Sequence, residues 1–164
     1  MDVSQKNPPQ QQNLIQVTLA HEQTKGRGQK KKDWLSPKNA GLYLTYARKN
    51  INEHRITKLS IWSGIAVFEA CAAMGIPKDK MQIKWPNDLL IDGKKVAGIL
   101  IELTHQGKNS CAHIGIGCNL KQPNKMPQAN GLDAYMPNLN PNRLAAQIIE
   151  RLHTHTKIKT NAQA

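Results

Sequence analysis

The sequence predicts one α/β domain, of the α+β kind, with a mixed central sheet and flanking helices. Three observations carry this prediction. Two apolar runs meet at Asp92-Gly93, a dipeptide that favours the positive φ angles of a two-residue hairpin turn. Residues 110–120 alternate apolar side chains with glycine or histidine, as a strand does. Two further segments, 59–73 and 141–152, repeat apolar residues at helical spacing.

Length and composition limit the class of protein. The chain has 164 residues, of which 39% are hydrophobic, enough for one buried core and too few for two domains. Its 23 basic and 11 acidic residues give a formal charge of +12, which favours polyanions, nucleotides or an acidic protein partner. Three cysteines without a CxxC pair predict buried free thiols. No apolar run reaches the roughly 20 residues that span a bilayer, so we expect a cytoplasmic protein without a membrane partner.

The ends of the chain differ in composition from its middle. Residues 1–12 are rich in Gln, Asn and Pro, cannot repay the entropy of folding, and are expected to form a disordered tail. Residues 157–164 are expected to form a second tail. The predicted folded domain therefore covers residues 13–156.

The remaining elements follow from local patterns. Gly75 and Pro77 are stop signals for the first helix, and Asn140 with Pro141 supplies the N-cap and first position of the last one. Trp62 in the first helix is expected to pack in the core. The predicted strands and loops, in order, are strand 14–19, loop 24–37, strand 41–46, connection 48–55, strand 82–85, the hairpin around Asp92-Gly93, a turn at 106–109, strand 110–120 and loop 121–138.

Polar residues cluster at one end of the central hairpin. Lys84, Asn87 and Asp88 precede it or open its first strand, and Lys95 opens the second. Residues 96–101 of that strand are apolar or glycine, which predicts cover on both faces. A lysine at the mouth of such a strand is well placed to hold a negatively charged substrate. A lysine solvated at a hairpin end is the plainer interpretation.

Glycines mark two other stretches. Gly26 and Gly28 flank Arg27 in the basic loop, so the backbone there can turn its N–H groups toward an anion, although a solvated basic loop is the alternative. Gly115 and Gly117 share one face of their strand and leave room for a ligand or another backbone. Tight packing against a helix would explain these two glycines equally well.

Two motifs together resemble the signature of the biotin protein ligases. They are Lys84-Trp85-Pro86-Asn87-Asp88 followed by Lys95-Val96-Ala97-Gly98-Ile99-Leu100-Ile101-Glu102, and Gln23-Thr24-x-Gly26-Arg27-Gly28 followed by Trp34-x-Ser36-Pro37. The similarity extends over about 14–152 and implies the class II aminoacyl-tRNA synthetase-like fold of that catalytic domain. Members join biotin to ATP, with Mg²⁺, to give biotinyl-5′-AMP. They then transfer biotin to a lysine of the biotin carboxyl carrier protein of acetyl-CoA carboxylase.

The resemblance implies a role for each matched residue. Lys95 matches the lysine that contacts the biotin carboxylate and the α-phosphate, and Arg27 and Asp88 complete the expected catalytic set. Asp88 also matches a position that could help to hold Mg²⁺. Trp34 matches an aromatic that packs on adenine. The residues expected to bind biotin, biotinyl-AMP or ATP are Gln23, Gly26, Arg27, Gly28, Gln29, Lys30, Trp34, Lys84, Asn87, Lys95, Gly98, Ile99, Gly115, Gly117 and Asn119.

The chain departs from the family pattern in four places. Gln29 stands where the family loop commonly has arginine, and an amide lacks the charge and forked donors that bind a phosphate. We therefore expect early release of the adenylate and nonspecific labelling of lysines. No Ser-Thr-Asn triplet precedes the first strand, and neither a C-terminal β-barrel nor an N-terminal winged helix is expected. The chain thus resembles a catalytic domain truncated at its N-terminus and without the C-terminal domain.

Two other functional hypotheses stay open. A lipoate or octanoyl transferase-like enzyme has a similar domain, but the Trp85-Pro86-Asn87-Asp88 string favours biotin. A degenerate, non-catalytic homologue could bind nucleotide or nucleic acid through the basic loop. One phenylalanine, three tyrosines and three tryptophans are too few for an obvious base-stacking platform, so DNA binding is not expected. Pairing of two copies through sheet edges is a further expectation from the resemblance.

Overall fold

The computed structural model describes residues 15–51, 56–106, 109–124 and 126–156. The two predicted tails, 1–12 and 157–164, lie outside these ranges. The elements in chain order are β1 (Ile15–Ala20), the 3-10 turn η1 (Gln29–Lys31), β2 (Gly41–Lys49), α1 (Ile56–Ala73), η3 (Lys78–Lys80), β3 (Met81–Lys84), β4 (Asp88–Ile91), β5 (Lys94–Gln106), β6 (Asn109–Asn119), η4 (Leu132–Ala134) and α2 (Pro141–Thr156).

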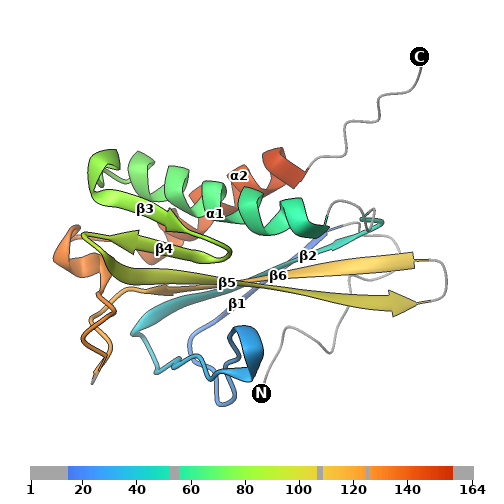
Figure 1. Ribbon diagram of the computed structural model, residues 1–164, viewed down its shortest axis with the longest axis horizontal. Coiled ribbons are helices and arrows are strands. Elements are labelled where there is room, and N and C mark those ends of the chain that lie inside the picture. The colour runs from blue at the N-terminus through green and yellow to red at the C-terminus, as the bar shows by residue number, and fades with distance from the viewer. Residues whose placement is uncertain (1–14, 52–55, 107–108, 125, 157–164) are drawn as a thin grey trace.

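The strands form one six-stranded sheet in the order β1-β2-β6-β5-β4-β3, with α1 and α2 packed on the same face (Figure 1). This confirms the α/β class with a central sheet and flanking helices. All strand neighbours in the described part are antiparallel, so the sheet is more regular than the mixed one predicted. Asp92 and Gly93 both have positive φ, 48° and 75°, as the predicted hairpin turn requires.

Two strands are longer than the sequence predicted. β2 continues through Arg48 and Lys49, which had been placed in a connection, because both still pair with β6. The Arg48 side chain is buried, and its Nη1 donates a hydrogen bond to Thr156 Oγ1 at 3.2 Å. β5 pairs with β6 as far as Gln106 and Asn109. Polar side chains at the end of a sheet are therefore a poor sign of where a strand stops.

The core lies between the sheet and the two helices. α1 contributes buried Leu59, Val67 and Cys71, and Trp62 packs against this core, as predicted. α1 ends where Gly75 has a φ of 106° and the Ile76 N–H donates to the Cys71 carbonyl at 3.2 Å. This is the usual glycine-terminated helix end, in which the left-handed residue satisfies a free carbonyl of the last turn.

The second helix begins as predicted. Asn140 Oδ1 accepts hydrogen bonds from the backbone N–H groups of Asn142 and Arg143, at 3.0 and 3.2 Å, so Asn140 is the N-cap. The preceding loop is more ordered than its prolines and glycines suggested. It contains η4, whose Leu132 is fully buried in the core. Neither helix among the described residues is long and apolar enough to cross a membrane.

The three cysteines are free and buried, as predicted. Their burial makes the free energy of unfolding depend on pH in the alkaline range. Burial raises the pKa of Cys71 to about 12 and that of Cys118 well above its ordinary 9.0. At a pH between the ordinary thiol pKa of 9.0 and the raised pKa of Cys71, about 12, the unfolded chain has released thiol protons that the folded chain keeps. The free energy of unfolding therefore falls as pH rises above about 9. Urea unfolding at about pH 8 and about pH 10 measures this fall. A slope no shallower in a Cys71→Ala variant would contradict the assignment to the thiols.

Candidate functional site

The loop between β1 and β2 lies on the face of the sheet that the helices leave open (Figure 1). Backbone hydrogen bonds close it: the Gln23 N–H donates to the Ser36 carbonyl at 3.1 Å, and the Trp34 N–H to the Gly26 carbonyl at 2.9 Å. The Ser36 hydroxyl also donates to Gln23 Oε1 at 2.7 Å. Gly26 needs its missing side chain, because a Cβ there would collide with the Trp34 carbonyl. The loop is therefore a fixed ribbon that presents Arg27 and Trp34 to the sheet.

Trp34 lies on a pair of glycines in the sheet. Gly98 of β5 and Gly117 of β6 are directly opposite each other. A Cβ added to Gly117 would lie 2.5 Å from the indole, and one added to Gly98 would lie 2.8 Å from it. Both positions must be glycine for the ring to sit there. Gly115 differs, since a Cβ there would make only an ordinary contact, 3.4 Å from the Leu100 carbonyl.

A β-bulge decides which way Lys95 points. Lys95 and Gly98 are three residues apart, so in a regular strand they would lie on opposite faces. The consecutive residues Leu89–Leu90 of β4 oppose Ala97 and Lys95, which leaves Val96 as the extra residue of the bulge. Val96 is fully buried, whereas Lys95 lines the cavities on the open face with Gly98. Without the bulge the predicted lysine would be directed into the core.

The polar cluster predicted at the hairpin end is brought together. Lys95 Nζ lies 2.7 Å from Asp88 Oδ1 and 5.1 Å from the centre of the Trp34 ring. Asn87 is tied to β5, because its Nδ2 donates to the Ile99 carbonyl at 3.1 Å and its own carbonyl accepts from the Ile99 N–H at 2.8 Å. The Lys95 and Asp88 side chains are 30% and 20% exposed, whereas the Asp88 Oδ1 atom of the ion pair is buried.

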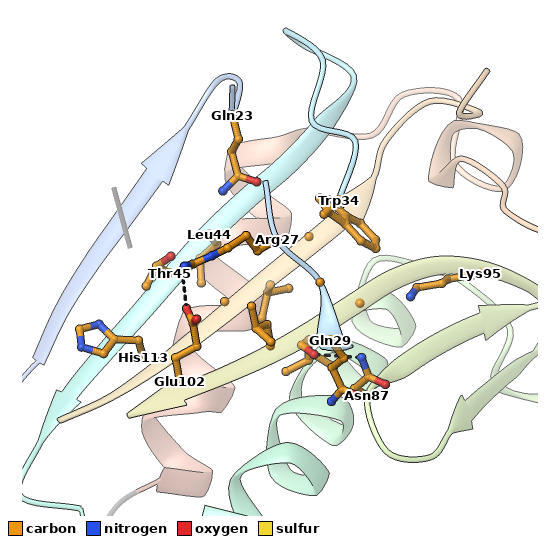
Figure 2. Close-up of a pocket in the computed structure, with 17 residues that line it drawn as sticks. Gln23, Arg27, Gln29, Trp34, Leu44, Thr45, Asn87, Lys95, Glu102 and His113 are labelled. Atoms are coloured by element: carbon orange, nitrogen blue, oxygen red, sulfur yellow. Dashed lines mark hydrogen bonds and ion pairs between the residues drawn. The ribbon is translucent and has the colours of Figure 1, made fainter. Parts of the chain in front are cut away.

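A second ion pair lies at the other end of the open face (Figure 2). Arg27 Nη2 and Glu102 Oε2 are 2.9 Å apart, which joins the basic loop to β5. Glu102 stands opposite His113 of β6, and His113 Nε2 lies 3.0 Å from Thr104 Oγ1. Residues 102 and 104 follow Gly98 at two-residue spacing, so they share its face. That alternation is the signal in the sequence that could have identified Glu102.

Two cavities meet at Lys95. The first is narrow, about 70 Å³, and runs over the open face of the sheet from Lys95 toward Glu102 (Figure 2). The second is wider, about 500 Å³, and lies between the basic loop, the β3–β4 turn and the segment after β6. Both cavities are lined by Gly28, Gln29, Trp34, Asn87 and Lys95.

Nearly every residue selected from the sequence lines one of these cavities. The first cavity is also lined by Gln23, Arg27, Gly98, Ile99, Gly115 and Gly117. The second cavity is also lined by Lys30, Lys84, Asp88 and Asn119. Gly26 lines neither cavity, but its carbonyl accepts the hydrogen bond from the Trp34 N–H. The lining residues that were not among the predicted site residues are Leu44, Thr45, Leu100, Glu102, His113, Ile116, Lys32, Asp33, Leu35, Trp85, Pro86, Pro123, Met126, Gln128 and Ala129.

The site is cationic and contains a buried hydrogen-bond donor. The Trp34 Nε1 is buried and has no hydrogen-bond partner among the described residues. Buried donors are normally satisfied, so this one favours a ligand with an acceptor atom. Within the described ranges no group of three or more His, Cys, Asp or Glu residues could hold a metal ion by itself. Asp33 and Asp88 are the carboxylates that border the wider cavity.

The structure is thus an α/β domain with two joined cavities that share one lysine, Lys95. The chain belongs to the biotin/lipoate A/B protein ligase family, whose model matches residues 4–119.

Curated relatives agree with this membership. The chain is 35% identical over 143 residues to the bifunctional ligase/repressor BirA of Escherichia coli (strain K12), which covers 82% of this chain and 43% of BirA. It is 35% identical over 103 residues to the biotin--[acetyl-CoA-carboxylase] ligase of Paracoccus denitrificans, covering 62% of this chain and 43% of that protein. The chain thus spans less than half the length of these relatives.

Solved structures share the fold. The biotin protein ligase of Leishmania major in complex with biotinyl-5-AMP superposes with a TM-score of 0.70 at 27% identity, covering 84% of this chain and 63% of that one. The biotin protein ligase of Aquifex aeolicus in complex with biotin and ATP gives 0.69 at 28% identity, covering 85% and 59%. These neighbours confirm the predicted fold class of a biotin ligase catalytic domain.

Proposed function

We propose that this chain is the catalytic domain of a biotin protein ligase, which makes biotinyl-5′-AMP from biotin and ATP and transfers biotin to a carrier lysine. The observation that carries the proposal is the position of Lys95 at the junction of two cavities. A single cation shared by two ligand spaces suits a reaction that joins two anionic substrates.

The chemistry needs charge neutralisation and alignment. A biotin carboxylate oxygen attacks the α-phosphorus of ATP, a P–O bond forms, and the bond to the leaving pyrophosphate breaks. Carboxylate and triphosphate repel each other, and a fixed ammonium group between them lowers that repulsion most where charge builds up in the transition state. Holding both substrates against one wall, formed by Gly28, Gln29, Trp34, Asn87 and Lys95, also supplies the proximity of an intramolecular reaction.

The two cavities suit the two substrates differently. The narrow one has the paired glycines and polar groups such as Thr45 and Glu102, which fit the ring end of biotin. The wider cavity, bordered by Lys30, Lys84 and Asn119, suits a nucleoside triphosphate. Two observations favour biotin over lipoate. The similar protein of Paracoccus denitrificans is named a biotin ligase, and the similar solved structures are biotin protein ligases in complex with biotinyl-5-AMP or with biotin and ATP.

A magnesium ion fits the donor set beside the wider cavity. Mg²⁺ in such enzymes is usually held by one or two carboxylates together with substrate phosphates and water, so one available carboxylate is enough. Asp88 would hold the ion, which would neutralise phosphate charge when bound. Asp88 also faces Lys95 at 2.7 Å, so the two side chains fix each other at the place where the phosphates would lie.

The second half-reaction consumes the adenylate. A neutral lysine amine of the acceptor attacks the biotinyl carbonyl carbon, the new C–N bond forms, AMP leaves with the electron pair of the broken C–O bond, and the nitrogen gives up one proton to water. The acceptor we propose is the biotin carboxyl carrier protein of acetyl-CoA carboxylase. A cytoplasmic location and pairing of two copies are parts of the same proposal.

Biotin-dependent exchange of labelled pyrophosphate into ATP tests this function. We expect exchange with the 164-residue chain, none without biotin, and none when lipoate or octanoate replaces biotin. Exchange with lipoate would favour the transferase-like alternative. A steeply salt-dependent affinity for nucleic acid without any exchange would favour the non-catalytic homologue.

Gln29 predicts how long the adenylate is kept. It lines both cavities, where an arginine would offer a charged fork to the phosphate. A Gln29→Arg variant should release biotinyl-5′-AMP about 10-fold more slowly, as expected for one charge-assisted hydrogen bond, and label added bystander protein less. Release is measured by trapping labelled adenylate on a filter. A Lys25→Arg variant, altered at an exposed loop residue outside both cavities, is the control, and equal release from Gln29→Arg and wild type would refute the role.

A further inference from the structure

The backbone of Lys95 is hydrogen-bonded to a loop on one side of β5, while Leu90 of β4 lies opposite it on the other side. The ladder between β5 and β6 ends at the pair of Ala97 and Cys118, before it reaches Lys95. Beyond that point the Lys95 N–H donates to the Gln128 carbonyl at 3.0 Å, and the Lys95 carbonyl accepts from the Asn130 N–H at 2.9 Å. The segment 128–130 thus acts as a short parallel strand against the lysine, seen as the bridge between Lys95 and Ala129.

The Gln122 side chain braces this segment from within the loop. Gln122 Nε2 donates to the Ala129 carbonyl at 2.9 Å and lies 3.5 Å from the Met126 carbonyl. The Ala129 N–H in turn donates to the Met126 carbonyl at 3.0 Å. Gln122 itself is exposed and lines neither cavity, whereas Ala129 is buried. The amide of Gln122 therefore closes the loop onto the residues that hold Lys95.

We propose that Gln122 is a positioning residue for Lys95, acting through the backbone of segment 128–130. It touches no substrate in this assignment. It sets where the Lys95 backbone lies, and thereby where the ammonium group stands between the two cavities. The consequence for catalysis rests on the function proposed above, but the mechanical link does not.

The link has a physical scale. Loops open locally at low free-energy cost, and a segment held by a few hydrogen bonds near the surface opens more readily than a strand. Displacement of a catalytic group by about 1 Å can reduce a rate by about 100-fold. A brace that keeps 128–130 closed therefore affects the rate more than it affects global stability.

Backbone amide exchange of Lys95 tests the link directly. In both Gln122→Glu and Gln122→Leu, the Lys95 N–H should exchange about 5-fold faster, the size expected from loss of one hydrogen bond. The Ile99 N–H, which donates to Asn87 on the same strand, should keep its rate. The two substitutions differ in charge, so agreement between them excludes an electrostatic cause. Asn124→Asp, an exposed amide in the same loop, is the matched control and should leave both rates unchanged.

The catalytic part has its own readout. In the pyrophosphate exchange assay we expect kcat to fall about 10-fold in both Gln122 variants while KM for biotin stays within about 2-fold, the pattern of a misplaced catalytic group. Equal acceleration at Lys95 and Ile99, or none at either, would overturn the link. Faster exchange at Lys95 with unchanged kcat would overturn the catalytic consequence. If wild type shows no pyrophosphate exchange at all, the proposed function fails and amide exchange still decides the link.

Discussion

Replacing Lys95 by alanine should lower biotin-dependent pyrophosphate exchange by at least about 100-fold, the effect of losing one preorganised electrostatic contact in a transition state. The loss is larger than that of a single charge, because the substitution leaves the Asp88 carboxylate, 2.7 Å away in the native pair, facing the anionic substrates alone. The measurement is the initial rate of label transfer into ATP at saturating biotin and ATP.

Lys94 offers a matched control for this experiment. It is the preceding residue, carries the same charge, is exposed, and lines neither cavity. Lys94→Ala should therefore keep the exchange rate of the wild type. If Lys94→Ala loses as much activity as Lys95→Ala, the effect comes from the net charge of the hairpin, and the role assigned to Lys95 is wrong.

Replacing Gly117 by alanine should displace Trp34 and greatly weaken binding of both substrates. The added Cβ would lie 2.5 Å from the indole, too close for the ring to stay, and overpacking of this kind costs about 1–3 kcal/mol. Because Trp34 lines both cavities, its displacement should raise KM for biotin and for ATP by about 10-fold or more, a factor that corresponds to about 1.4 kcal/mol. Tryptophan emission should shift as the ring becomes more exposed.

The strand itself supplies a comparison for the Trp34 contact. In Gly115→Ala, two residues earlier on the same face, the new methyl group meets nothing closer than 3.4 Å. Its tryptophan emission should match that of wild type, since Trp62 and Trp85 are unchanged in both variants. A spectral shift in Gly115→Ala as large as in Gly117→Ala would mean that the strand, and not the ring contact, is what the substitutions disturb.

Much of the fold follows from local patterns in the sequence. The Asp92-Gly93 turn, the Asn140 cap and the glycine end of α1 each depend on one residue's own conformational preference, so each is visible in the sequence. The ends of β2 and β5 were not, because pairing with β6 carries polar residues such as Arg48 into the sheet. Burial of Leu132 was missed for a related reason, since the prolines and glycines around it are typical of loops.

The candidate site likewise has some features that the sequence predicts and others that it does not. Lys95, Asn87 and Asp88 are close in the sequence and were grouped correctly. Glu102 was not selected, because its partner Arg27 lies 75 residues away and the sequence alone does not bring them together. The bulge at Val96 is invisible for a different reason: it is a mismatch between two strands, and neither strand shows it alone.

That bulge also restricts how the hairpin can change over evolutionary time. Straightening the strand at its present length would turn the lysine toward the core, whereas deletion of Val96 would leave Lys95 two residues before Gly98 and so on the same face, since side chains alternate with a period of two. Descendants of this gene can therefore lose the bulge and keep the lysine on the open face of the sheet only if β5 becomes one residue shorter at the same time.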